Sequence, residues 1–283
     1  MEPIRDIADL AQRRGAAEAA AEGAALFYAF GNFCALAARP DLQSLEAMNR
    51  LKGRPLHQVG SVTTTPERSA KVFDWDQVHV PWSSLVAVMS DLNALGPIGF
   101  RGPAAAHIPD HLTQLDSDVR TVQLITPGDI CPSNALVGDI LDLIGEDILY
   151  ITSANTSSSV TGQIEAAHFE IKEIQKEFGH RDDVVLIGHR NERANRRRYP
   201  RHRACSTSII SFHEGELVLE RLGSLDALTI LEVANRHGLS LSLGEQAATP
   251  VPERKAARPS LPRPRRATRE TRRAAKRTLR IHA

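Results

Sequence analysis

The stretch LYITSANTSSSVTG, residues 149–162, starts as an apolar strand and passes directly into small hydroxyl and amide residues. Ser153 and Asn155 lie two positions apart, so in an extended segment their side chains would face the same way. Open α/β sheets bind ligands where strands end, and such side chains suit hydrogen bonds to a phosphate, a ribose or a base. A polar loop with an Asx turn is the alternative interpretation.

On both sides of this stretch, short apolar runs alternate with amphipathic segments, which favours an α/β domain over a bundle or a sandwich. The sequence predicts helices at residues 4–14, 42–51, 133–144, 163–178 and 226–238. Asp226 is expected in the N-cap region of the last helix. The sequence predicts strands at residues 24–30, 119–126, 146–155, 183–189 and 206–212. Residues 215–223 are expected to pair with the last of these strands as a hairpin.

The composition is typical of a globular protein from a reducing compartment. Of the 283 residues, 42% are hydrophobic and 24% are charged. The N-terminus lacks the apolar centre of a secretory signal, and the absence of any apolar run of about 18 residues argues against a membrane span. The cysteines Cys34, Cys131 and Cys205 are far apart and odd in number, which favours a reduced, cytoplasmic protein.

Charge is distributed unevenly along the chain. Residues 247–283 hold 12 Lys or Arg and 2 Glu, a net of +10, so the preceding residues carry −9 within the total of +1. The same segment is rich in Pro, Ala and Arg and poor in large apolar residues, which predicts a disordered tail. We therefore divide the chain into a folded domain, residues 1–240, and a basic tail, residues 241–283. The tail is interpreted either as a solubilising segment or as an arm for a polyanion.

Lys52 and Arg54 flank a glycine at the end of a predicted helix, in the sequence KGRP. Gly53 allows a close approach of the backbone and Pro55 stops the helix, so both cations could reach one polyphosphate. Cations are also favoured at a helix C-terminus without any ligand, so this tetrapeptide alone leaves both interpretations open.

Five short motifs occur in a fixed order, and together they resemble the YrdC-like family of ATP-dependent threonylcarbamoyl-adenylate synthases. They are KGRP at 52–55, GFRGP at 99–103, TSANTSSSVTG at 152–162, CSTSII at 205–210 and LERLGS at 219–224. The resemblance covers roughly residues 20 to 230. It implies a twisted, open, mixed α/β sheet with helices around a deep basic cavity for ATP.

In that family, L-threonine and bicarbonate give a carbamate whose oxygen attacks the α-phosphate of ATP, and pyrophosphate leaves. The adenylate then supplies the threonylcarbamoyl group for tRNA modification. The resemblance implies that Lys52 and Arg54 clamp the phosphates as catalytic residues, with Arg101 as a weaker candidate. It implies further nucleotide contacts from Ser153, Asn155, Ser206, Thr207 and Arg221. Mg²⁺ is expected to arrive with the ATP phosphates, and no protein-bound metal is expected.

The first motif departs from the family pattern. The family begins with Pro-Thr-(Asp or Glu)-Thr-x-Tyr-Gly-Leu, which shapes the amino-acid pocket, whereas this chain has YAFGNFCALAA at 28–38. Asn32 stands in place of a threonine and Cys34 in place of the tyrosine, so these two residues are the expected acyl-substrate pocket. Asn32 can still donate and accept hydrogen bonds, but the hydroxyls are missing.

Three functions therefore stay open: a threonylcarbamoyl-AMP synthase, an adenylating enzyme with a different acyl substrate, and a non-catalytic paralogue that binds nucleotide or RNA. Asn32 and Cys34 pointing into the cavity near Lys52 would favour chemistry, and their burial in the core would favour binding. The segment from Arg190 to Arg203 holds seven arginines against one glutamate. It is interpreted either as a solvated loop or as a contact for tRNA, with Tyr199 as a stacking surface.

Overall fold

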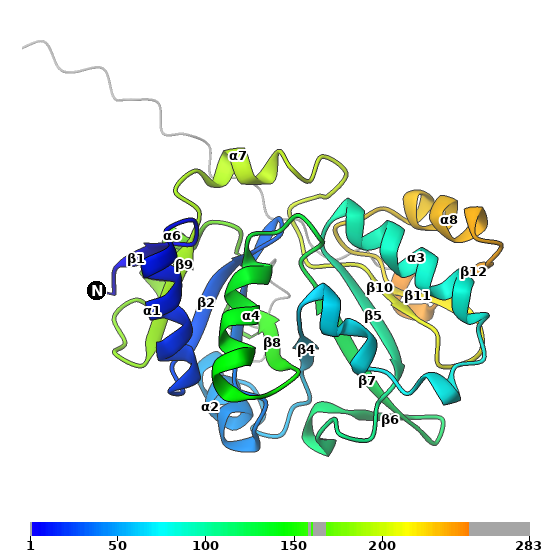
Figure 1. Ribbon diagram of the computed structural model, residues 1–283, viewed down its shortest axis with the longest axis horizontal. Coiled ribbons are helices and arrows are strands. Elements are labelled where there is room, and N and C mark those ends of the chain that lie inside the picture. The colour runs from blue at the N-terminus through cyan, green and yellow to red at the C-terminus, as the bar shows by residue number, and fades with distance from the viewer. Residues whose placement is uncertain (1, 158–159, 161–167, 249–283) are drawn as a thin grey trace, which may run out of the picture.

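A computed structural model describes residues 2–157, 160 and 168–248. Twelve strands form one open sheet in the order β1-β9-β2-β3-β8-β4-β7-β5-β10-β11-β12, with β6 paired to β7 (Figure 1). The sheet is mixed, because β1, β9 and β2 run parallel while β2, β3 and β8 alternate in direction. The strands are β1 Ile4–Asp6, β2 Ala25–Phe30, β3 Phe33–Ala38, β4 Ser61–Thr63, β5 Ile98–Pro103, β6 Gln114–Asp116, β7 Val119–Thr126, β8 Leu149–Ser153, β9 Val184–Gly188, β10 Ile209–Ser211, β11 Leu217–Arg221 and β12 Leu241–Leu243.

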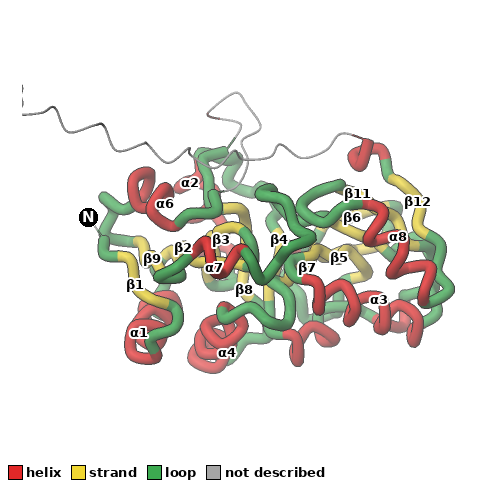
Figure 2. The backbone as a smooth tube through the Cα atoms, turned by 90° about the horizontal axis from the view of Figure 1, so that it is seen from above, coloured by secondary structure: helices red, strands yellow, loops and turns green. Residues whose placement is uncertain are grey.

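Helices cover both sides of this sheet. Figure 2 shows α1, α4 and α3 along one side, with α2 and α6 along the other. Within the described part of the chain, no helix is long and apolar enough to cross a membrane. The α-helices are α1 Leu10–Ala21, α2 Leu42–Lys52, α3 Trp82–Leu95, α4 Ser133–Ile144, α6 Ile171–Phe178, α7 Glu192–Arg196 and α8 Ala227–Arg236. The 3-10 helices are η1 Pro66–Lys71, η2 Trp75–Gln77, η3 Asp110–Leu112 and η4 Glu245–Ala248.

Strand β3 shows how the two apolar cores are separated. Its side chains alternate between the faces of the sheet, as a strand requires. Cys34 and Leu36 lie in the core that includes residues of α2 and α6. Phe33 and Ala35 lie in the core that includes residues of α1 and α4. Neighbouring residues of this strand therefore belong to different cores.

The N-terminal segment differs from the predicted helix over residues 4–14. Ile4 to Asp6 form β1, which pairs in parallel with β9, and the helix starts only at Leu10. Asp9 caps that helix, because its side chain accepts hydrogen bonds from the backbone nitrogens of Ala11 and Gln12. The apolar spacing of this segment suits a helix, but backbone pairing with a distant strand decides its first residues.

Most of the other predicted elements are confirmed. Strand β7 covers residues 119–126, and β10 and β11 form the expected antiparallel hairpin. Asp226 caps α8 by accepting from the backbone nitrogen of Thr229 at 2.9 Å. Of the helix predicted at 163–178, α6 supplies residues 171–178, while residues 163–167 lie outside the described residues.

The folded part of the chain continues past residue 240, where the sequence placed its boundary. Strand β12 pairs in parallel with β11, and η4 follows it to residue 248. Residues 241–248 therefore belong to the sheet domain rather than to the tail. The predicted disordered segment from residue 249 onward lies outside the described residues.

Candidate functional site

A cavity of about 250 Å³ opens where β8 ends, and three arginines line it, so we call it the arginine cavity. Its walls come from β5, β7, β8 and β11, from the segment before β10, and from the segment between α2 and β4. Among the described residues, no Asp or Glu lines it. The lining residues are Phe33, Arg54, Gln58, Val59, Gly60, Ser61, Arg101, Leu112, Gln114, Thr121, Gln123, Ile125, Ile151, Thr152, Ser153, Ser206, Thr207 and Arg221.

Arg54 reaches the cavity from the C-terminal end of α2. Gly53 ends this helix with a φ of 67°, a left-handed conformation that suits glycine. The space beside Gly53 is already filled, because an added Cβ would lie 2.2 Å from Cγ2 of Val160. Arg54 donates from Nη1 to Oγ1 of Thr152 at 2.8 Å, while its buried Nε has no partner among the described residues. Thr152 therefore fixes the guanidinium of Arg54 at the wall of the cavity.

Lys52 lies behind the cavity wall and does not line the cavity. Its side chain is 1% exposed, and Nζ donates to Oγ1 of Thr152 and Oγ of Ser153 at 3.2 Å each, and also to the Ser153 carbonyl. Burial lowers the pKa of this ammonium well below its usual value, and the neighbouring Arg54 lowers it further, while Glu177 opposes the shift. The direct partners of Lys52 are thus the two residues that end β8.

Arg101 is held by a ring of polar partners. Its guanidinium pairs with Glu220 at 2.9 Å and with Asp116 at 3.3 Å. It also donates to Oε1 of Gln123 at 2.9 Å and to Oε1 of Gln114 at 3.0 Å. Two carboxylates balance the charge of Arg101, so its guanidinium is not a free cation for a ligand. Its role is to hold the strands at the floor of the cavity together.

Arg221 and the segment before β10 form the opposite wall. Arg221 donates to the carbonyl oxygen of Thr207 at 3.0 Å and to its Oγ1 at 3.2 Å. Burial lowers the pKa of this guanidinium to about 10, so it stays charged at neutral pH. Ser206 and Thr207 both line the cavity, as does Ser153 from β8. The structure thus brings Arg54, Ser153, Ser206, Thr207 and Arg221 together around one space.

Asn155 does not follow Ser153 into the cavity. The backbone nitrogen of Asn155 donates to the Ser153 carbonyl at 3.1 Å, so the chain turns immediately after the strand. The Asn155 side chain is buried and donates to the carbonyl of Thr156 at 2.9 Å. The prediction that the two side chains face the same way is therefore wrong, because the extended geometry it assumed ends at Ser153.

Asn32 and Cys34 also lie away from the cavity, although the sequence assigned them to an acyl-substrate pocket. Asn32 sits between β2 and β3 and donates to the carbonyl oxygen of Arg203 at 2.5 Å. Cys34 is buried in the core shared with α2 and α6, and this burial raises the pKa of its thiol. The residue of this motif that lines the cavity is Phe33, on the opposite face of β3.

Several cavity residues were not predicted from the sequence. Thr121 and Gln123 alternate with apolar residues on β7, and Gln123 donates to Oγ of Ser61 at 2.5 Å. Two polar residues on one face of a strand whose other face is mostly apolar at Val122 and Leu124 were a usable signal. No comparable signal marks Gln58 or Gln114, which reach the cavity from outside the central strands.

The carboxylate of Glu177 fixes the segment that follows β8. The backbone nitrogen and the hydroxyl of Thr156 both donate to Glu177 of α6, the former at 3.0 Å. The other carboxylate oxygen of Glu177 pairs with Nε2 of His168 at 2.6 Å. Among the residues that the structure describes, no group of three or more His, Cys, Asp or Glu could hold a metal ion.

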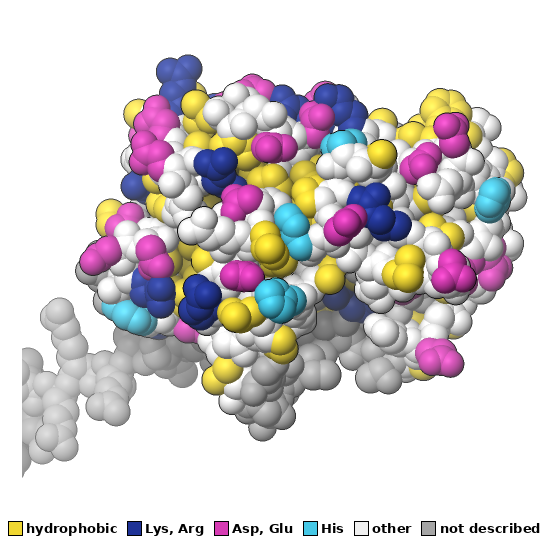
Figure 3. All heavy atoms as spheres, turned by 90° about the horizontal axis from the view of Figure 1, so that it is seen from below, with side chains coloured by type: hydrophobic (Ala, Val, Ile, Leu, Met, Phe, Trp, Pro, Cys, Tyr) yellow, Lys and Arg dark blue, Asp and Glu magenta, His cyan; other side chains and the backbone are white. Residues whose placement is uncertain are grey.

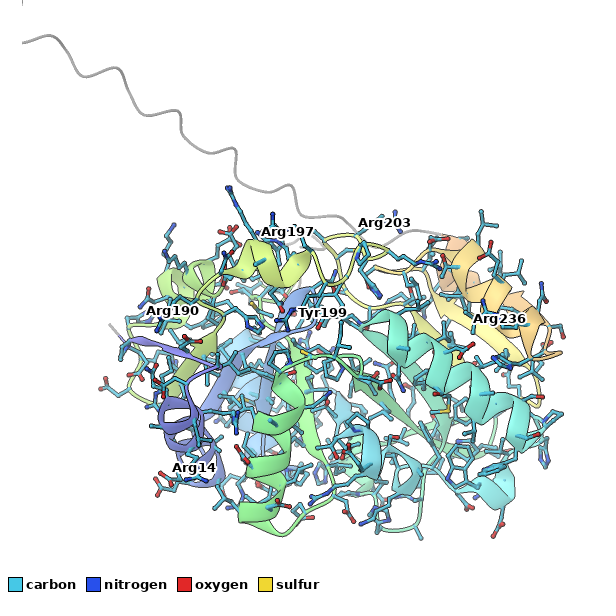
Figure 4. All side chains as sticks on the ribbon, turned by 45° about the horizontal axis from the view of Figure 1, so that its top comes forward. Arg14, Arg190, Arg197, Tyr199, Arg203 and Arg236 are labelled. Carbon is cyan, nitrogen blue, oxygen red and sulfur yellow. The ribbon has the colours of Figure 1, made fainter. Side chains whose placement is uncertain are left out.

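The arginine-rich segment from Arg190 to Arg203 forms the upper edge of the molecule. Figure 4 shows Arg197 and Arg203 along this edge, with Tyr199 beneath them. Tyr199 is 1% exposed, so it offers no stacking surface and that prediction is wrong. The underside of the molecule differs, because there Lys and Arg alternate with Asp, Glu and His (Figure 3).

An open mixed sheet with a cavity at a strand end is the arrangement in which many α/β proteins bind ligands. No family model and no curated protein matches the sequence. A double variant of Sua5 from P. abyssi matches over 85% of this chain and 65% of its own length, with 17% identity and a TM-score of 0.62. Sua5 from P. abyssi complexed with L-threonine matches over 96% of this chain and 74% of its own length, with 15% identity and a TM-score of 0.57.

A hypothetical protein from Streptococcus mutans UA159 matches over 78% of this chain and 90% of its own length, with 13% identity and a TM-score of 0.53. This chain therefore has the YrdC-like fold. It spans less than two thirds of the length of the first Sua5 structure.

Proposed function

We propose that the arginine cavity binds ATP and that the protein is an adenylate-forming enzyme of the threonylcarbamoyl-AMP synthase type. The observation that carries this proposal is the convergence of two arginines and six hydroxyl side chains on a cavity without a carboxylate in its described lining. The arginines are Arg54 and Arg221, and the hydroxyls include those of Ser153, Ser206 and Thr207. Such a lining favours anions, because guanidinium groups and hydroxyls both donate to phosphate oxygens. The likeness of fold to Sua5 supports the same class of chemistry.

In the proposed reaction, a carbamate oxygen formed from L-threonine and bicarbonate attacks the α-phosphate of ATP. A new P–O bond forms, the bond to the β-phosphate breaks, and pyrophosphate leaves with that electron pair. Arg54 and Arg221 would offset the charge that develops on the phosphates. Lys52 would position Ser153 rather than touch the nucleotide, since its ammonium already contacts the two residues that end β8.

The size of the cavity limits what it can enclose. Pockets for small molecules usually measure about 300–1,000 Å³, and this one measures about 250 Å³. In our proposal it holds the reacting end, with the acyl group near Phe33, Ile125 and Ile151, while the rest of the nucleotide extends outward. Mg²⁺ would enter on the ATP phosphates, which usually carry it with few protein ligands.

The structure identifies fewer candidate residues for the acyl substrate than for the nucleotide. The P. abyssi Sua5 complex with L-threonine supports an amino-acid-type substrate. The positions expected to shape that pocket, Asn32 and Cys34, lie outside the cavity in this chain. An adenylating enzyme with a different acyl substrate is therefore included in the proposal.

A non-catalytic protein that binds nucleotide or RNA is the second candidate. Two observations favour it: Cys34 is buried in the core, and the Lys52 ammonium is engaged by the protein itself. RNA would then approach the segment from Arg190 to Arg203, with residues 249–283 as a further basic contact.

The experiment that separates these functions measures pyrophosphate release from ATP with bicarbonate and a panel of amino acids, beside a direct ATP titration. Release that depends on threonine supports the synthase, and release with another acid identifies a different substrate. ATP binding without release under any condition selects the non-catalytic candidate. Absence of both binding and release would overturn the ATP site itself.

A further inference from the structure

A second cavity of about 640 Å³ lies at the carboxyl ends of two parallel strands. Asp6 ends β1 and His189 follows β9, and both residues line it. The other walls come from the start of α6 and from the segment that contains α7. Among the described residues, its lining shares no member with that of the arginine cavity. Carboxyl ends of parallel strands are where open α/β sheets bind ligands, so this position is a candidate site in its own right.

The lining of this second cavity carries more positive than negative charge. Its carboxylates are Asp6, Glu170 and Glu192. Its cations are Arg5, Lys172, Arg190, Arg193 and Arg196. Five cations against three carboxylates leave a formal surplus of two positive charges, with His189 counted as neutral. Figure 4 shows Arg190 at the left side of the molecule, below Arg197 and Arg203.

Three of the five cations are already paired. Arg190 contacts Asp6 at 3.2 Å, and Arg196 contacts Glu170 at 3.4 Å. Arg5 lies 3.7 Å from Glu2, outside the lining. The third lining carboxylate, Glu192, accepts instead from the backbone nitrogen of Ile171 at 2.7 Å.

Lys172 and Arg193 are the two remaining cations. Within the described part of the chain, neither forms an ion pair, although the charge of Lys172 opposes the rise in the pKa of Glu192, and both cations are exposed. They come from different elements, since Lys172 belongs to α6 and Arg193 to α7. Two cations brought to one cavity by separate elements can contact one anion from two sides.

His189 adds an unmet hydrogen-bonding group to the same wall. Its Nε2 is buried and has no hydrogen-bond partner among the described residues. Burial lowers the pKa of this imidazole, and the charge of Arg198 lowers it further, while Asp6 opposes the shift. A neutral imidazole can donate or accept one hydrogen bond at this nitrogen. Buried polar groups normally have a partner, and rotation of the imidazole toward the cavity would let this nitrogen hydrogen-bond a bound ligand.

We propose that the second cavity binds a phosphate monoester of a small molecule, held by Lys172 and Arg193, with His189 hydrogen-bonded to the ligand. A phosphate monoester carries a charge of about −1.5 to −2 near neutral pH. This charge balances the formal surplus of two positive charges in the cavity lining. The cavity volume lies within the range of small-molecule sites. This site goes beyond the proposed adenylate chemistry and does not depend on it.

The test uses the full-length protein with ¹⁵N-labelled backbone amides, titrated separately with ribose 5-phosphate, inorganic phosphate and ribose. Ribose 5-phosphate should shift the amides of Lys172 and Arg193, and ribose should leave them in place. The double variant Lys172→Gln, Arg193→Gln should weaken this binding by about tenfold or more, because it removes the two charged donors to the phosphate oxygens.

A matched control is available on the same two segments. Lys176 lies on α6 and Arg197 follows α7, and both are exposed and outside the cavity lining. The double variant Lys176→Gln, Arg197→Gln removes the same charge, so it should change the affinity by no more than about twofold. Equal weakening by both double variants would mean a diffuse surface effect and would overturn the site.

Two further outcomes would also overturn the proposal. One is the absence of shifts at Lys172 and Arg193 with either phosphate probe up to about 10 mM. The other is an RNA oligonucleotide without terminal phosphates that shifts the same amides and binds more tightly than ribose 5-phosphate. That result would assign the cavity to a nucleic-acid backbone. Shifts at Ser206 and Thr207 report the arginine cavity separately, so failure of one proposal is distinguishable from failure of the other.

Discussion

Replacing Lys52 with methionine should remove part of the pH dependence of stability. The Lys52 ammonium is buried against Thr152 and Ser153, and burial lowers its pKa well below the usual value. In the unfolded chain the pKa returns to about 10.4. The folded protein therefore loses this proton at a lower pH than the unfolded chain does.

The sign of the effect follows from proton binding. Between the two pKa values the unfolded state binds more protons, so the free energy of unfolding rises with pH, by at most about 1.4 kcal/mol per pH unit. Burial of the ammonium thus destabilises the fold below the folded pKa, and this destabilisation is relieved as the pH rises toward about 10.4. Methionine has a similar length and no titrating group, so Lys52→Met lacks this rise.

Urea unfolding of both proteins between roughly pH 6 and pH 10 measures the effect. The free energy of unfolding of the wild type, minus that of Lys52→Met, should increase with pH. Lys176→Met, at an exposed lysine of α6, is the matched control, and its difference from the wild type should stay nearly constant over the same pH range. A constant difference between wild type and Lys52→Met would refute the buried, pKa-shifted ammonium.

Three further changes probe other parts of the structure. Cys34→Ala should leave ATP affinity unchanged in a titration and lower the free energy of unfolding by about 1 kcal/mol, because the thiol fills the core and not the cavity; a large drop in affinity would contradict its placement. Gly102→Ala should destabilise the protein by about 1–3 kcal/mol in thermal unfolding, because its Cβ would lie 2.2 Å from the buried Phe212 ring, and wild-type stability would show that the ring can move. Asp226→Ala should cost about 1 kcal/mol in urea unfolding, whereas Asp226→Asn should retain most of the cap of α8; equal losses would argue against capping.

The elements that the sequence predicted best are those fixed by local pattern. Strand β7 combines β-branched residues with alternation, and α8 has a cap residue at its start, so both have the expected positions. For β1 the prediction is wrong, because Ile4 and Ile7 also fit a helical period. Its pairing with β9, some 180 residues away, is a long-range contact that no local pattern contains.

The candidate site was predicted in part for the same reason. The motif order placed Arg54, Ser153 and Arg221 around one cavity, because each follows or ends an element of the shared fold. Cys34 and Phe33 lie on opposite faces of β3, and the cavity opens on only one of them. Which face that is depends on the packing of helices that are distant in the sequence. The engagement of Lys52 by the end of β8 likewise depends on how α2 docks, about 100 residues away in the chain.

The most direct test of the central claim is an ATP titration of the wild type, Arg54→Ala and Arg50→Ala by calorimetry. Arg50 is exposed near the same end of α2 and does not line the cavity, so it controls for the removal of one positive charge. We predict that the wild type binds ATP, that Arg54→Ala weakens binding by about tenfold or more, and that Arg50→Ala changes it by less than about twofold. Unchanged affinity in Arg54→Ala, or no binding by the wild type, would contradict the assignment of the arginine cavity to ATP.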